Sequence, residues 1–269
     1  MFKKIFTEFL NTDEVKKFES QNAVTPGRQR ALTFGAVLMF SNKEPLRTFK
    51  MMHTDTNQIE GLRAGFGEWW NIYDGQEALF VLDSLTNTKG HTDFADEVYK
   101  KFILPLRGDK RFGVRHINIT PDQIQDLSGL EKGFERAGGD IFALCEMINR
   151  GMKAYDQVWY DLQKIGKGYN YTSEELLSVE NFAAWDLGRV VFIARNSVAL
   201  GYVGEDETWP YIEKAAETAS QLYSSWREYL AAYCLGRALG FGSYKNIDFE
   251  VKYLLKDPNS PYNDSCFKA

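Results

Sequence analysis

Cysteine is scarce in this chain, and its spacing excludes several classes of protein. Three cysteines occur among 269 residues, at Cys145, Cys234 and Cys266. An odd number of widely separated cysteines, with no Cys-x-x-Cys pair, gives no support to a disulfide framework or a zinc ribbon. Cys145 and Cys234 stand in apolar segments, so we expect them to be small core residues of a protein from a reducing, cytoplasmic compartment.

Histidine is equally rare, which argues against a metal centre. His53, His91 and His116 are far apart, and no His-Glu-x-x-His motif occurs. We therefore predict no metal site and no cofactor. The chain also lacks a Gly-x-Ser-x-Gly elbow and a Walker phosphate loop, so the covalent hydrolase and nucleotide triphosphatase classes have no support from the sequence.

Basic side chains and long apolar runs are also in short supply. The 32 lysines and arginines are outnumbered by 37 aspartates and glutamates, which gives a net charge of −5. This balance argues against a nucleic-acid partner and is compatible with a basic protein partner. The most apolar window of helical length, residues 182–200, is interrupted by Asp186, Arg189 and Arg195, so no membrane span is expected.

The chain does contain an internal repeat of twelve residues. Residues 180–191 recur as residues 228–239 with six identical positions. Each copy has an alanine four positions before a glycine, and i and i+4 share one helix face. Such a strip of small residues lets another backbone approach closely. The repeat therefore predicts two adjacent core helices that meet near Gly188 and Gly236.

Charged residues interrupt both copies of this apolar repeat. Asp186 and Arg189 stand three positions apart on one predicted helix, and Arg237 follows the glycine of the second copy. A buried charge is costly unless it is paired. One interpretation is a structural ion network in which Asp186 bridges the two arginines. The other is an anion site, in which both arginines bind a phosphate or a carboxylate.

Helix signals dominate the rest of the sequence and predict a mainly α protein, a single-domain multi-helix bundle with few or no strands. We expect residues 1–25 to form an N-terminal helical extension and residues 26–269 the helical domain, with a boundary between two helical layers near 108–120. The expected helices span residues 26–41, 56–70, 74–87, 120 onward, 172–200, 205–223 and 225–242. Residues 249–255 show a weak strand pattern that lacks a partner.

Aromatic side chains make up 14% of the residues, and most of them suit a helical core. Trp69 and Trp70 are the exception, because adjacent residues cannot share one face of a helix. One of the two tryptophans should be exposed or buried against another layer. An exposed tryptophan beside Tyr73 would suit a protein-binding anchor, so Trp69, Trp70 and Tyr73 are the candidate binding residues.

Several ordered motifs of the chain resemble one family. They are Ala184-Trp185-Asp186-Leu187-Gly188-Arg189, Gly201-Tyr202, Trp209, Ser224-Ser225-Trp226, Gly236-Arg237 and the closing 254–262, preceded by Trp70-Asn71-Ile72 and Gly90-His91. Together they are similar to the bacterial YbeU/YbeR-like family, a domain of unknown function with the number 1266. Asn71 and Tyr262 depart from its usual glycine and tryptophan. The resemblance implies a bacterial, cytoplasmic and mostly helical protein, and it supplies no catalytic residues.

Two functions of different classes remain open from the sequence. The first is a non-catalytic protein-binding protein, most plausibly an immunity-type inhibitor of a basic bacterial toxin. The second is an enzyme that acts on an anionic small molecule through a site around Asp186, Arg189, Arg237 and His91. A flat acidic or aromatic surface would favour the binding protein, and a deep pocket with convergent polar groups would favour the enzyme.

Overall fold

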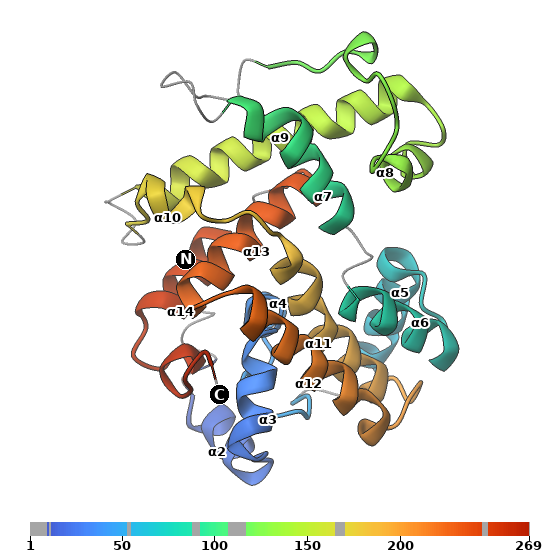
Figure 1. Cartoon of the computed structure of the whole chain (residues 1–269). Coiled ribbons are helices and arrows are strands. Elements are labelled where there is room, and N and C mark those ends of the chain that lie inside the picture. Colours follow the sequence, from blue (N-terminus) through green and yellow to red (C-terminus); the bar gives the residue numbers. More distant parts are fainter. Residues whose placement is uncertain are drawn as a thin grey trace. The chain divides into compact units, whose positions relative to one another are not determined.

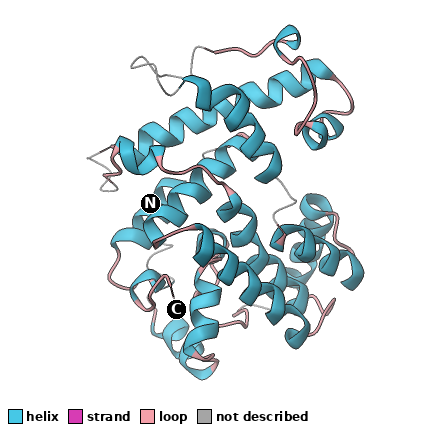
Figure 2. Cartoon of the chain, viewed as in Figure 1, coloured by secondary structure: helices cyan, strands magenta, loops and turns pink. Residues whose placement is uncertain are grey.

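The fold is built from α-helices. The computed structural model describes residues 10, 12–52, 55–87, 92–106, 117–164, 170–243 and 247–268. Within these ranges no strand is formed, and the one extended pairing is an isolated bridge between Ala23 and Thr48 (Figure 2). The expectation of a mainly α, multi-helix fold is confirmed. None of the described helices has the length and apolar character that a membrane crossing needs.

The chain divides into two compact units, each assembled from separate stretches of sequence. The first unit contains residues 1–87, 186–226 and 249–269, and the second contains residues 88–185 and 227–248. The layer boundary that we expected near 108–120 falls mainly on residues outside the described ranges, and the units divide at other positions. That expectation stays a prediction.

The first unit surrounds one buried helix, α11 (Ala183–Ala199), whose residues 186–197 are all buried. A helix that is apolar on most of its circumference belongs in a core. Figure 1 shows the helices of this unit: α2 (Asp13–Gln21), α3 (Pro26–Thr33), α4 (Ala36–Ser41), α5 (Thr56–Trp70), α6 (Gly75–Thr86), α12 (Glu205–Leu222) and α14 (Ile247–Lys256). Within it, α12 packs against α3 and α6.

The second unit has its own buried helix, α13 (Trp226–Phe241). Around it lie α7 (Thr92–Val98), α8 (Glu131–Arg136), α9 (Ile141–Gln163) and α10 (Ser173–Leu177). Helix α7 continues as a π turn over Tyr99–Ile103 and a 3-10 turn over Leu104–Leu106. Within this unit, α9 and α13 cross closely. A Cβ atom on Gly151 would stand 2.5 Å from the Leu239 carbonyl oxygen, so the two backbones touch there.

The two copies of the repeat are in contact, as the small-residue strip predicts. The Tyr229 hydroxyl donates a hydrogen bond to the Ala184 carbonyl at 3.1 Å. A Cβ atom on Gly236 would stand 2.7 Å from the Cβ of Phe182, and one on Gly240 would reach the Trp185 ring. These contacts involve residues 182–185 of the first copy, one turn before the glycine at which we expected the crossing.

Two of the expected helices are shorter in the structure than the sequence suggests. The segment 26–41 breaks at Gly35, where the chain approaches α11 closely. A Cβ atom on Gly35 would stand 2.4 Å from the Cβ of Val191. The segment 172–200 breaks before α11. There the N–H of Phe182 donates to Asp96 at 3.2 Å and its carbonyl accepts from Thr92 at 3.4 Å, so these backbone groups bond to α7 instead of continuing a helix.

Two further local expectations are corrected. The start signal at Thr120 does form a capping box with Gln123, but it opens a short 3-10 turn, Pro121–Gln123, and no long helix follows. Residues 249–255, which we considered as an extended segment, lie in helix α14 instead. The helix α12 begins at Glu205 and keeps Pro210 inside it.

Candidate functional site

The helical pair α5–α6 of the first unit carries the most distinctive exposed surface of the described chain. Its first helix begins at a capping box, in which Asp55 accepts from the N–H of Gln58 at 3.0 Å and Gln58 accepts in return. The helix ends at Asn71, which adopts the left-handed conformation with φ of 55°. A left-handed C-terminal residue is a common helix stop, and asparagine tolerates it. The next helix, α6, begins after its N-cap residue Asp74. The carboxylate of Asp74 accepts a hydrogen bond from the N–H of Glu77 at 2.9 Å.

This helical pair is fixed to the rest of the first unit by side chains from the inner faces of α5 and α6. Phe66 packs against Phe192 of α11, with ring centroids 6.2 Å apart. The guanidinium of Arg63 lies 5.8 Å from the ring centroid of Tyr202. A Cβ atom on Gly75 would stand 2.3 Å from the Tyr202 carbonyl oxygen, so the start of α6 touches the backbone beyond α11. The outer faces are thereby presented on a fixed support.

Three large aromatic side chains are exposed on this support. Trp69 is 67% exposed, Tyr73 is 62% exposed and Phe80 is 76% exposed. Trp70 is half-buried. The adjacent tryptophans therefore point to different environments, as expected for neighbours on a helix. Aromatic residues are enriched at protein interfaces, which makes exposed rings candidates for binding.

One of the exposed rings, that of Tyr73, lies over a glycine of α5. A Cβ atom on Gly67 would stand 2.6 Å from the ring of Tyr73, so the tyrosine lies directly over this glycine. The Tyr73 hydroxyl donates to the Gly67 carbonyl at 3.3 Å, and the Tyr73 N–H donates to Glu77 at 2.6 Å. At Gly65, a Cβ atom would stand 3.9 Å from Cδ1 of Trp69, so the glycine leaves open space beside this indole. A ring that is held in place before binding, as the Tyr73 ring is, loses little conformational entropy when a partner buries it.

The same segment carries a negative local charge. Residues 55–87 carry six acidic side chains and one basic side chain, a local charge of −5 that equals the net charge of the whole chain. The acidic side chains are Asp55, Glu60, Glu68, Asp74, Glu77 and Asp83, and the basic one is Arg63. All of them except the half-buried Glu77 are exposed. The remainder of the chain is formally neutral, because its acidic and basic side chains are equal in number.

The charged residues predicted within the repeat separate into two groups. Asp186 and Arg189 form an ion pair within α11, and both are buried. The Arg189 guanidinium also lies 5.4 Å from the ring centroid of Trp70, so the pair extends to α5. Arg237 is half-buried and belongs to the second unit. Its pairing with Asp186 stays a prediction.

The surroundings of this ion pair favour a structural role over a ligand site. Asp186 is fully buried, and neither it nor Arg189 lines the cavity beside α2 or the cavity at the start of α5. A cation over an aromatic face is stabilised without any ligand. The three histidines lie outside the described residues, so His91 adds nothing to the enzyme hypothesis. Among the described residues, no group of three or more acidic, histidine or cysteine side chains is arranged to hold a metal ion.

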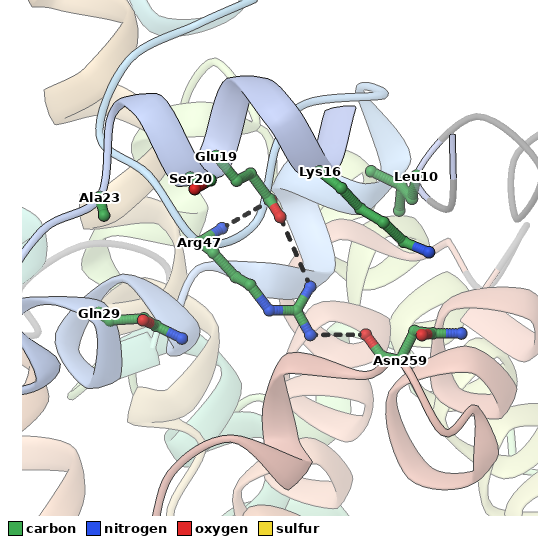
Figure 3. Close-up of a pocket in the computed structure, with 8 residues that line it drawn as sticks. All are labelled: Leu10, Lys16, Glu19, Ser20, Ala23, Gln29, Arg47 and Asn259. Atoms are coloured by element: carbon green, nitrogen blue, oxygen red, sulfur yellow. Dashed lines mark hydrogen bonds and ion pairs between the residues drawn. The ribbon is translucent and has the colours of Figure 1, made fainter. Parts of the chain in front are cut away.

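A polar cavity of about 340 Å³ lies beside α2 in the first unit. Figure 3 shows Glu19 and Arg47 pointing toward one another inside it. Glu19 accepts hydrogen bonds from the N–H groups of Leu46 at 2.8 Å and Arg47 at 3.0 Å. The Arg47 guanidinium donates to Asp264 at 2.5 Å and to the carbonyl of Asn259 at 2.8 Å.

These contacts join the N-terminal helix to the C-terminal segment. Burial alone would lower the pKa of Arg47, but the hydrogen bond and charge of Asp264, together with the charge of Glu19, outweigh it and raise the pKa. The polar groups of this cavity thus satisfy one another, which suits a structural junction. The exposed Lys16 also lines the cavity, but one lysine on a surface does not make an anion site.

Sequence reasoning found part of this candidate site and missed part. Trp69, Trp70 and Tyr73 were identified from the rule for adjacent aromatic residues. Phe80 was missed, because one phenylalanine in an apolar helix looks like a core residue. The local charge of residues 55–87 was also missed, although a windowed charge count would have found it.

Comparison with known families identifies the family of the chain and assigns it no activity. The family model described as "Protein of unknown function (DUF1266)" matches residues 66–266, which is most of the chain. The matched segment starts within α5 and covers Trp69, Tyr73 and the whole of α11. Comparisons with curated proteins and with solved structures found no match. The chain belongs to the DUF1266 family of proteins of unknown function.

Proposed function

We propose that this protein acts by binding another protein through the outer face of α5–α6, and that it performs no catalysis. The observation that carries the proposal is the set of exposed rings of Trp69, Tyr73 and Phe80, of which Tyr73 lies over Gly67 of α5. Tyrosine and tryptophan are enriched among the residues that dominate binding energy at interfaces. Truncation of one such anchor typically costs about 2 kcal/mol or more of binding free energy.

The charge of the same surface selects the class of partner. The local charge of −5 on residues 55–87 favours a basic protein and repels acidic ones. Such a field raises the rate of association with a cationic partner and weakens with added salt. A compact acidic protein that neutralises a basic toxin by occupying its surface has these properties. We therefore propose an immunity-type inhibitor, with a toxin as the partner, as the specific role.

The test compares two exposed aromatic sites of equal exposure. The full chain is immobilised as wild type, as Trp69→Ala/Tyr73→Ala and as Phe142→Ala, and each is incubated with lysate of the organism that encodes it. Phe142 is a matched control because it is 67% exposed, as Trp69 is, and lies on α9 of the second unit. We expect a basic protein that the wild type and the control retain and the double variant loses.

The captured protein is then expressed with and without this chain in a growth assay. Restored growth with the wild type, and not with the double variant, supports the immunity role. The proposal is contradicted if no captured protein depends on Trp69 and Tyr73. It is also contradicted if the purified chain shows turnover of an anionic substrate that Asp186→Asn or Arg237→Ala abolishes.

A further inference from the structure

A second cavity, of about 350 Å³, lies at the start of α5 in the first unit. Its volume is at the lower end of the range of about 300–1,000 Å³ that is common for ligand pockets. Apolar side chains from three segments form most of its wall, and the polar lining comes from residues 42–44 and 58. The apolar lining residues are Pro45, Met51, Met52, Ile59, Leu62 and Phe192.

Hydrogen bonds, an ion pair and ring packing hold the base of this cavity to α11. Arg195 is fully buried in α11, where it donates to the carbonyls of Phe49 at 2.7 Å and Lys50 at 3.0 Å. The same guanidinium lies 3.5 Å from the carboxylate of Glu44, which lines the cavity. On the other side, Phe192 packs on Phe66 of α5. Residues 42–52 and α5, which form two walls of the cavity, are thus both attached to α11.

The two methionines give this rigid cavity an adaptable wall. Met51 and Met52 are half-buried, and a methionine side chain adjusts its shape to the group that it contacts. Methionine is frequent on surfaces that bind apolar side chains of partner helices. A fixed base with a flexible wall suits the insertion of one aliphatic or aromatic side chain.

Leu62, at the cavity, and the exposed Trp69 project from α5 in similar directions, although the rest of the cavity extends toward α11. Leu62 lines the cavity, and Trp69 follows it by seven residues, which is two helical turns. Residues seven apart are separated by about 10 Å along the axis and point in nearly the same direction. The cavity and the Trp69 ring therefore form two apolar contact points in line on one helix.

We infer that this line of contacts receives a basic amphipathic helix of the partner. One apolar side chain of that helix enters the cavity beside Leu62, and another, two turns along, contacts Trp69. The charges of residues 55–87 sum to −5, and all of them except that of the half-buried Glu77 are exposed. This favours a partner helix with a cationic face, even though Lys43 also lines the cavity. Charge complementarity selects such a helix over an acidic one and over a second copy of this chain. The inference rests on the proposed function and specifies what that surface recognises.

The test uses synthetic peptides of defined composition and the full chain. One peptide is a helix of leucine and lysine with the leucines on one face, and its counterpart has glutamate in place of every lysine. Binding is measured by fluorescence anisotropy of the labelled peptides. The cavity is filled by Leu62→Trp and, in a second variant, by Ile59→Trp. Leu222→Trp on α12, where the leucine is exposed, is the control. Thermal melts verify that each variant is folded.

We expect the lysine peptide to bind the wild type and Leu222→Trp with equal affinity, and the glutamate peptide not to bind. Each cavity variant should weaken binding of the lysine peptide by about tenfold or more, since it removes the space for an anchoring side chain. Unchanged affinity in both folded cavity variants overturns the inference. So does absence of lysine-peptide binding, equal binding of the glutamate peptide, or a dimer of this chain that Leu62→Trp dissociates.

The outcome separates this inference from the proposed function. If the natural partner is lost by Trp69→Ala/Tyr73→Ala and retained by both cavity variants, the proposed function stands and the helix in the cavity is wrong. If capture of the partner is unaffected by the aromatic variants as well, the proposed surface itself is wrong.

Discussion

At the scale of single residues, the most informative feature is the buried pair of Asp186 and Arg189. Both residues lie on α11, where every neighbour from 186 to 197 is buried. Desolvation of two charges is expensive, and a close partner is needed to offset it. The ring of Trp70 provides a further favourable contact for the cation. The pair thereby joins the core helix to the helix that carries the exposed aromatic residues.

Removal of the carboxylate of Asp186 should destabilise the first unit strongly. Asp186→Ala leaves the Arg189 cation buried without its carboxylate, which we expect to cost about 3–5 kcal/mol of the free energy of unfolding. The measurement is urea denaturation of Asp186→Ala, with Asp83→Ala as control because Asp83 is exposed on α6. The control should change the free energy by less than about 0.5 kcal/mol. An unchanged midpoint for Asp186→Ala would revive the ligand interpretation of this pair.

A second titratable residue gives the second unit a pH dependence. Burial is the main cause that raises the pKa of Asp96 from its ordinary value of 3.8 to about 6, and the charges of Asp93 and Glu97 add to it. The hydrogen bond from Phe182 and the charge of Lys100 act in the opposite direction. A carboxyl group whose pKa is higher in the folded state contributes stability below its ordinary pKa. That contribution is lost as the pH rises through about 6.

Asp96→Asn should therefore stabilise the protein at neutral pH. The amide oxygen of asparagine can still accept from the N–H of Phe182, and it carries no charge to desolvate. We expect the variant and the wild type to melt together near pH 4 and to diverge between about pH 4 and 7, with a gain of up to about 3 kcal/mol for the variant. Melting temperatures across this pH series decide the point. A constant difference at all pH values would be inconsistent with a raised pKa.

At the scale of elements, glycines determine which helices can cross closely. Gly236 of α13 stands against Phe182, and Gly151 of α9 stands against the backbone of Leu239. Both crossings belong to the second unit. A side chain at either position has to displace main-chain atoms or a buried ring, which a packed core resists.

Gly236→Ala tests the crossing of the repeat directly. A methyl group would approach the Cβ of Phe182 to 2.7 Å and its carbonyl oxygen to 3.0 Å, so we expect a loss of about 1–3 kcal/mol despite the better helix propensity of alanine. Gly27→Ala on α3 is the control, because no atom lies within 4 Å of the added group. Equal melting temperatures of the two variants would contradict the close crossing.

Gly67 of α5 faces an exposed ring, whereas the glycines at the helix crossings face buried groups. Gly67→Ala would place a methyl group 2.6 Å from the ring of Tyr73, and this exposed ring can move away at little cost in stability. We expect normal or slightly raised thermal stability and weaker partner binding, because the methyl group displaces the Tyr73 ring from its position over residue 67. Gly61→Ala meets no atom within 4 Å and should raise stability by up to about 1 kcal/mol without any effect on binding. Calorimetric titration of both variants with the captured partner provides the comparison. Equal affinities would show that the seating of Tyr73 is irrelevant.

At the scale of the whole molecule, the sequence predicts the helical fold well where the signals are local. The capping residues Asp55 and Asp74 and the apolar spacing of α5 place these helices correctly. The breaks at Gly35 and before Phe182 could not be predicted, because they arise from contacts with residues far away in the sequence. A capping box at Thr120 likewise opened only a short turn, since a cap satisfies backbone donors and does not sustain a helix.

The candidate site shows the same division between local and distant information. The exposure of one tryptophan of the adjacent pair follows from helix geometry alone. The seating of Tyr73 on Gly67 and the contact of Trp70 with Arg189 depend on the turn at Asn71 and on the packing of α11. Family membership adds no function to this description, so the functional argument depends on the surface of α5–α6.

The central claim is that this surface contacts the partner, and hydrogen–deuterium exchange on the purified complex tests it most directly. The captured partner is mixed with the full chain, and exchange is compared with that of the free chain. We predict protection in peptides that cover 56–86 and, if a partner helix occupies the cavity, also in peptides that cover 42–52. Peptides from α8 and α9 should exchange as in the free chain. Protection confined to α8 and α9, with none in 56–86, would contradict the account.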